Sequence, residues 1–102
     1  MGAKVTRRGD MFREQDAIDA FAREALTPSQ WSNGPGDVYG AHSHTYHKVL
    51  YCLRGSITFR LGDGDEIALG PGDRLDLEPG TMHSAVVGPN GVACVEAPRS
   101  TA

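Results

Sequence analysis

The chain has few of the residues from which the common kinds of site are built. Its 102 residues include two cysteines, four histidines and one tryptophan. The cysteines do not have C-x-x-C spacing, which excludes the usual zinc-finger and dithiol motifs, and two are too few for a disulfide scaffold. Any chemistry must therefore come mainly from histidine and from charged side chains.

An excess of one charge and long apolar runs are also missing. Ten Lys and Arg residues stand against 13 Asp and Glu residues, the net charge is -3 and neither sign is segregated, so we expect no nucleic-acid or membrane partner. No run of ~20 apolar residues occurs, and no apolar segment follows the basic residues at the N-terminus. We expect a soluble, cytoplasmic, single-domain protein.

Cys52 and Cys94 each lie in an apolar stretch, between Leu50 and Leu53 and between Val92 and Val95. A free cysteine in such surroundings behaves as a small hydrophobic side chain. Buried, reduced thiols are the favoured interpretation. A disulfide stays open, because the sequence does not set the separation of the two residues.

An amphipathic helix is predicted over residues 13–26. Apolar side chains recur there at spacings of three and four, and Thr27-Pro28 ends the pattern because proline disfavours a helical residue before it. This divides the chain into an N-terminal arm and helix, residues 1–28, and a remainder, residues 29–102. Such an apolar face must pack across the rest of the domain or onto a second subunit.

Glycine and proline punctuate the remainder and separate short runs typical of strands. Gly55 marks a turn or bend, and Asn90-Gly91 predicts a hairpin. No helices separate the runs, so the fold class is all-β, an antiparallel jelly roll or barrel with one short N-terminal helix. The predicted strands are 48–53, 56–61, 66–69, 74–77, 84–87 and 92–97.

Three of the four histidines fall within six residues, at His42, His44 and His47, and the fourth is His83. Imidazole is the commonest protein ligand for transition metals. A metal site is therefore the leading hypothesis.

Two segments of this region resemble the two motifs of the cupin superfamily. Residues 40–55, GAHSHTYHKVLYCLRG, contain a histidine pair, a hydrophobic strand and a glycine. Residues 71–83, PGDRLDLEPGTMH, contain a Pro-Gly-Asp turn, a strand, a proline-glycine turn and a histidine. Both motifs occur in the right order with the right gap, which is more specific than either alone. The resemblance implies a cupin barrel over residues 29–102.

The resemblance also implies that His42, His44 and His83 bind a divalent transition metal, Fe, Mn, Ni, Zn or Cu, with a glutamate as the usual fourth ligand. The aligned position carries Lys48 instead. A protonated lysine repels a cation and offers no lone pair. Either Lys48 points away from the site, or no metal binds.

His47 offers a substitute for that glutamate. On an unbroken strand it would face away from His42 and His44, but a bulge or loop between Thr45 and Lys48 would turn it inward and give four imidazole ligands. The alternative is a three-histidine site with water at the open positions. Either site has only neutral ligands, which favours an anionic chelating substrate.

Two functions of different classes follow from the resemblance. One is a metal-dependent oxygenase or isomerase that acts on a small oxygen-rich molecule, and the other is a non-catalytic cupin module that binds or senses a small ligand. The general base of an enzyme would be sought among Glu96, His47, Tyr51 and Lys48. Trp31 and Tyr46 are candidates for a pocket mouth. We also expect a homodimer, because two-fold pairing is the commonest assembly.

Overall fold

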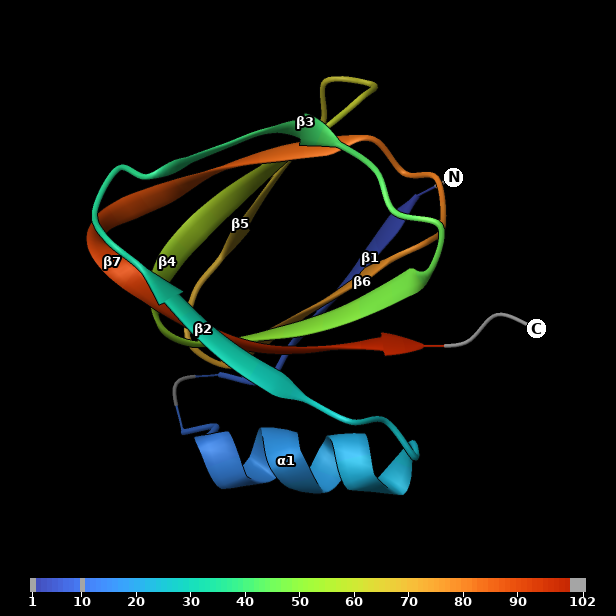
Figure 1. The fold of residues 1–102 in the computed structure, drawn as a ribbon. Helices are drawn as coiled ribbons and strands as arrows, with labels where there is room; N and C mark the ends of the chain where they lie inside the picture. Colours follow the sequence, from blue (N-terminus) through green and yellow to red (C-terminus); the bar gives the residue numbers. More distant parts are fainter. Residues whose placement is uncertain (1, 10, 100–102) are drawn as a thin grey trace.

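The computed structural model describes residues 2–9 and 11–99 and shows a β-barrel with one helix outside it (Figure 1). This confirms the predicted all-β fold class. Three short strands, β1, β2 and β3, were not predicted, since the motifs that mark them are weak. The elements in chain order are β1 Ala3–Arg7, α1 Glu14–Arg23, β2 Ser29–Asn33, β3 Val38–His42, β4 His47–Leu61, β5 Glu66–Leu69, β6 Asp73–Leu77 and β7 His83–Arg99.

The barrel consists of two antiparallel halves that share two long strands. The first half has the order β1-β6-β4-β7-β2, and in the second half β5 pairs with β4 and β3 pairs with β7. β4 and β7 pair along nearly their whole length, from His47 opposite Arg99 to Leu61 opposite His83. The apolar core, which includes Leu50, Cys52 and Phe59, fills the space between the halves.

β4 and β7 bend together where they pass from one half to the other. The predicted strands 48–53 and 56–61 are parts of β4, and 84–87 and 92–97 are parts of β7. The hairpin predicted at Asn90-Gly91 is wrong, because β7 continues through both residues. Gly91 has φ +78 and its backbone lies against that of Gly55, φ +72, so these glycines serve a shared bend.

Helix α1 packs on the outer face of β4 and β7, below the barrel in Figure 1. Phe21 is fully buried there, and its ring meets that of Tyr51 edge to face. Of the two predicted ways to cover this face, the structure shows packing across the barrel. The helix ends at Arg23 rather than at residue 26, because Ala25 takes φ +58 and the amide of Leu26 turns back to the carbonyl of Phe21.

The segment before the helix contributes a strand to the barrel, since β1 pairs with β6. Cys52 and Cys94 are free, buried and directly opposite each other on β4 and β7. Among the described residues no helix has the length and apolar character needed to cross a membrane.

Candidate metal centre

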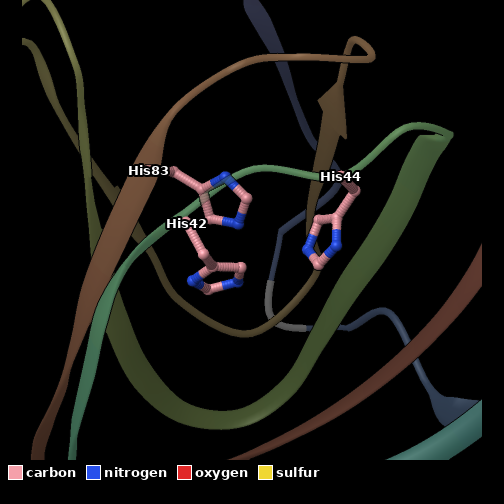
Figure 2. A group of neighbouring side chains, drawn as sticks. All are labelled: His42, His44 and His83. Atoms are coloured by element: carbon pink, nitrogen blue, oxygen red, sulfur yellow. The ribbon is translucent and has the colours of Figure 1, made fainter.

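Three histidines from two strands and a loop lie together at one end of the barrel (Figure 2). His42 ends β3 and His83 begins β7, and the two are directly paired in the sheet. His44 follows in the loop before β4, where its carbonyl accepts a hydrogen bond of 2.8 Å from the amide of Gly80. The two segments that resemble the cupin motifs therefore meet at these residues.

The three imidazole rings are close enough to share an ion. The centroid of the His42 ring lies 4.9 Å from that of His44 and 4.4 Å from that of His83, and the last two are 5.2 Å apart. One nitrogen from each ring lies within 4.8 Å of the others. Two nitrogens on a tetrahedral zinc ion are about 3.4 Å apart. The three nitrogens are therefore near the separation that a shared ion requires.

Hydrogen bonds to the backbone orient two of the rings. Nδ1 of His42 lies 2.7 Å from the carbonyl oxygen of Gly40, and Nδ1 of His83 lies 2.9 Å from that of Thr81. A carbonyl only accepts, so each Nδ1 carries the proton and each Nε2 keeps its lone pair. Metal-binding histidines are held in this way by an outer hydrogen bond.

The third ring contains a polar atom without a partner. Among the described residues, Nε2 of His44 is the one buried side-chain nitrogen or oxygen with no hydrogen bond. An unpaired buried polar atom costs about 1 to 3 kcal/mol. A cation bound at His42, His44 and His83 would satisfy this atom, so the residues present fit a metal ion.

The surroundings of His44 and His83 favour the neutral, ligand form of these two imidazoles. Burial lowers the pKa of His44, and the positive charge of Lys48 lowers it further. Burial also lowers the pKa of His83, partly offset by its hydrogen bond to the carbonyl of Thr81. A neutral imidazole is the form that binds metals.

His47 does not join this group. It begins β4 on the outer face of the barrel, and its Nε2 lies 3.0 Å from Oδ1 of Asp76. A loop separates β3 from β4, but it ends before His47 and does not turn that side chain inward. Of the two ligand sets left open by the sequence, the structure brings together three histidines and leaves out the fourth.

Lys48, the next residue, points into the barrel. Its Nζ lies 3.2 Å from Oε1 of Glu96, and the same oxygen accepts a hydrogen bond of 2.6 Å from Nε1 of Trp31. The sequence offered two choices, a lysine turned away or no metal. The first choice is wrong, since Lys48 lines the cavity, where the partly buried carboxylate of Glu96 balances its charge.

A cavity of about 240 Å³ adjoins the histidines. One part of its wall is apolar, with Ile57, Phe59 and Ala85, and the rest is polar. Asn33 and Tyr39, whose hydroxyl donates to the Asn33 side chain, were missed by the sequence reasoning, since both lie outside the motifs and no pattern marks them. The polar lining residues are Trp31, Asn33, Tyr39, His42, Lys48, His83 and Glu96.

The remaining predicted site residues fall into two groups. Glu96 and Trp31 line the cavity, and Tyr46 stacks on the ring of His44 with centroids 4.8 Å apart. Tyr51 lies on the outer face, where its hydroxyl accepts a hydrogen bond from Arg74. Tyr51 and His47 are therefore separated from the cavity, and Glu96 and Lys48 are the predicted bases that face it.

The fold and the histidine group together define a cupin. The cupin domain family matches residues 31–92, which include both motifs, all three clustered histidines and Lys48. The chain belongs to this family. No curated protein matches the chain.

Several solved structures share the fold. KdgF from a Halomonas species is 29% identical, with 74% of this chain and 71% of that chain covered and a TM-score of 0.58. A DUF861 family protein from Thermotoga maritima is 12% identical, with 96% and 100% covered and a TM-score of 0.68. The DMSP lyase DddQ from Ruegeria pomeroyi is 21% identical, with 74% and 39% covered and a TM-score of 0.68.

Proposed function

We propose that this protein is a small metal-dependent enzyme that moves a proton on a small oxygen-rich molecule, a reaction of the isomerase type. Its metal would be a divalent transition ion held by Nε2 of His42, His44 and His83. The observation that carries the proposal is the convergence of three imidazole lone pairs, one of which is buried without any partner.

A bound divalent ion would act as a Lewis acid that polarises a carbonyl or carboxylate oxygen of the substrate and acidifies the neighbouring C–H bond. An imidazole ligand carries no charge, so His42, His44 and His83 would leave the charge of the ion undiminished. The role of these residues would be to hold the ion at one side of the cavity.

Glu96 is the residue placed to accept the proton. Its carboxylate lines the cavity, and both of its polar contacts, from Trp31 and from Lys48, are made to Oε1. Oε2 makes neither contact and keeps its lone pairs for a ligand. A carboxylate fixed through one oxygen can act as a general base through the other.

The apolar wall serves the same chemistry. Ile57 and Phe59 are almost completely buried and, with Ala85, face the polar residues across the cavity. An apolar wall excludes water and strengthens the electrostatic interactions beside it. The site thus resembles an active-site cavity more than an open surface patch.

Metal content tests the proposed metal site at His42, His44 and His83. We expect about one metal ion per chain in the purified protein by elemental analysis, and its loss in the His42→Ala, His44→Ala double variant. His47→Gln is the matched control: it removes the outer-face histidine, keeps a donor for Asp76 and retains the metal. Equal metal in the double variant and in the wild type would contradict the site.

Hydrogen exchange tests the proposed proton transfer to Glu96. With the metal bound, pyruvate in heavy water serves as a probe, and NMR follows deuterium uptake at its methyl group. We expect uptake above the rate with free metal, and a fall of at least about tenfold in Glu96→Gln with metal content unchanged. Metal binding without any uptake of deuterium would favour the non-catalytic binding module.

A further inference from the structure

Lys48 lies where the cupin resemblance implies an acidic metal ligand, and it occupies the cavity. Only 13% of its side chain is exposed, and only 21% of the Glu96 side chain. Lysine is almost never buried without a reason, because its charge is costly to desolvate. The carboxylate of Glu96 explains how the charge of Lys48 is tolerated in the cavity. It does not explain what Lys48 contributes to the site.

The charges of the site indicate an anionic ligand. A divalent ion on three neutral imidazoles contributes +2, Lys48 contributes +1 and Glu96 contributes -1, so the loaded cavity has a net charge of about +2. A buried excess of positive charge is unfavourable unless a ligand compensates for it. Two negative charges on the ligand would neutralise the cavity.

The geometry separates two places where those charges can bind. The histidine group, of which His42 and His83 line the cavity, forms one, and Lys48 forms the other within the same lining. An ammonium group has three donors, and the single oxygen Oε1 of Glu96 can engage one of them. Lys48 therefore keeps donors for a second acceptor in the cavity.

The cavity limits the size of the ligand. Its volume of about 240 Å³ lies below the range of roughly 300 to 1,000 Å³ typical of drug-sized ligands. Its apolar wall, with Ile57 and Phe59, can contact a short carbon chain. A compact molecule with a charged group at each end fits these limits.

We propose that Lys48 is a specificity-determining residue that binds the second carboxylate of a small dicarboxylate substrate, whose first carboxylate lies at the histidines. This rests on the proposed function, since it requires the metal at His42, His44 and His83. At this position an anion-binding ammonium group replaces the usual acidic metal ligand. Lys48 therefore selects substrates that carry a second negative charge.

Trp31 provides the readout for a binding experiment. It is the single tryptophan of the chain, it lines the cavity and its Nε1 donates to Glu96. The zinc-loaded protein is titrated with succinate, with acetate and with the neutral succinamide, and tryptophan fluorescence is followed. We expect saturable binding of succinate at least about tenfold tighter than that of acetate, and no saturable binding of succinamide.

The variants isolate the role of Lys48. Lys48→Met should lose at least about tenfold in succinate affinity with acetate affinity unchanged, and Lys48→Arg should keep the preference for succinate. Lys4→Met is the matched control, because it removes the same charge from exposed Lys4 on β1, outside this cavity, and should bind as the wild type does. If Lys48→Met does not fold, Lys48→Met, Glu96→Gln removes both charges and should show the same loss.

Zinc content, measured in every sample, separates the two proposals. Wild-type protein without stoichiometric zinc would contradict the proposed function. Full zinc content with succinate binding that is equal in the wild type and in Lys48→Met would overturn the role of Lys48 alone. Succinamide binding as tight as that of succinate would also overturn it.

Discussion

His47 and Lys48 are neighbours in the chain and lie on opposite sides of the barrel wall. His47 contacts Asp76 on the outer face at 3.0 Å, and Lys48 pairs with Glu96 inside at 3.2 Å. Successive side chains of a strand point to opposite faces, and β4 begins at His47 without a bulge. This alternation decides that Lys48, rather than His47, faces the cavity beside the histidine group.

Because β4 and β7 share a tight bend at Gly55 and Gly91, one methyl group added at Gly55 should strongly reduce stability. Gly55→Ala would place a Cβ in direct conflict with the backbone carbonyl of Gly91, in addition to the strain of positive φ. Gly36→Ala is the control, because its φ of +76 is nearly the same and nothing lies within 4 Å. We expect Gly55→Ala to lose about 1 to 3 kcal/mol more in the free energy of unfolding, measured with urea. Equal losses would contradict the close contact.

We expect Asp76 to make a contribution to stability that depends on pH. Burial acts to raise the pKa of Asp76, but its hydrogen bonds with Arg74 and His47 outweigh that effect and lower the pKa. A lowered carboxyl pKa stabilises the fold fully above the ordinary pKa of about 4, and the stabilisation is lost as the pH falls through the lowered value.

Asp76→Asn should therefore cost about 1 to 3 kcal/mol at neutral pH and less in acid. Urea unfolding at several pH values measures this difference. Glu66→Gln, at an exposed position of β5, should change stability little at any pH. A cost for Asp76→Asn that is the same in acid and at neutral pH would contradict the assignment.

We expect the fold to protect the buried thiol of Cys94 from thiol reagents. Cys52 and Cys94 are fully buried, and the hydrogen bond with Cys52, together with burial, raises the pKa of Cys94. The thiolate is the reactive form of cysteine. We expect no reaction of Cys94 with a chromogenic disulfide in the native protein at mildly alkaline pH, and reaction of both thiols in guanidinium chloride. Rapid reaction of the native Cys94, tested in Cys52→Ser, would be inconsistent with this burial.

A homodimer stays a proposal, and the surface it would use differs from the helix face considered from the sequence. That face is buried against the barrel, whereas Val38 and Val86, paired across β3 and β7, are 71% and 51% exposed. We propose that this valine pair contributes to a two-fold interface. Light scattering at micromolar concentration should show a dimer, weakened in Val38→Asp, and a monomeric wild type would refute the proposal.

Much of the fold could be predicted from the sequence because the signals are local. Glycine and proline turns separate the strand-like runs, and residues 66–69 form a strand with the predicted limits. The paths of β4 and β7 could not be predicted in this way. Gly55 and Gly91 are typical of turns in isolation, and only the opposite strand converts each into a bend within a continuous strand.

The sequence by itself determined that the protein is a cupin, because residues 40–55 and 71–83 resemble the two cupin motifs, and this resemblance implied His42, His44 and His83 as the candidate metal ligands. Only the tertiary structure decided the rest. It turned His47 outward, placed Lys48 beside the histidines and brought Glu96, almost fifty residues further along the chain, to the same cavity. Contacts between distant segments depend on strand pairing and on the face of each strand, which local spacing does not encode.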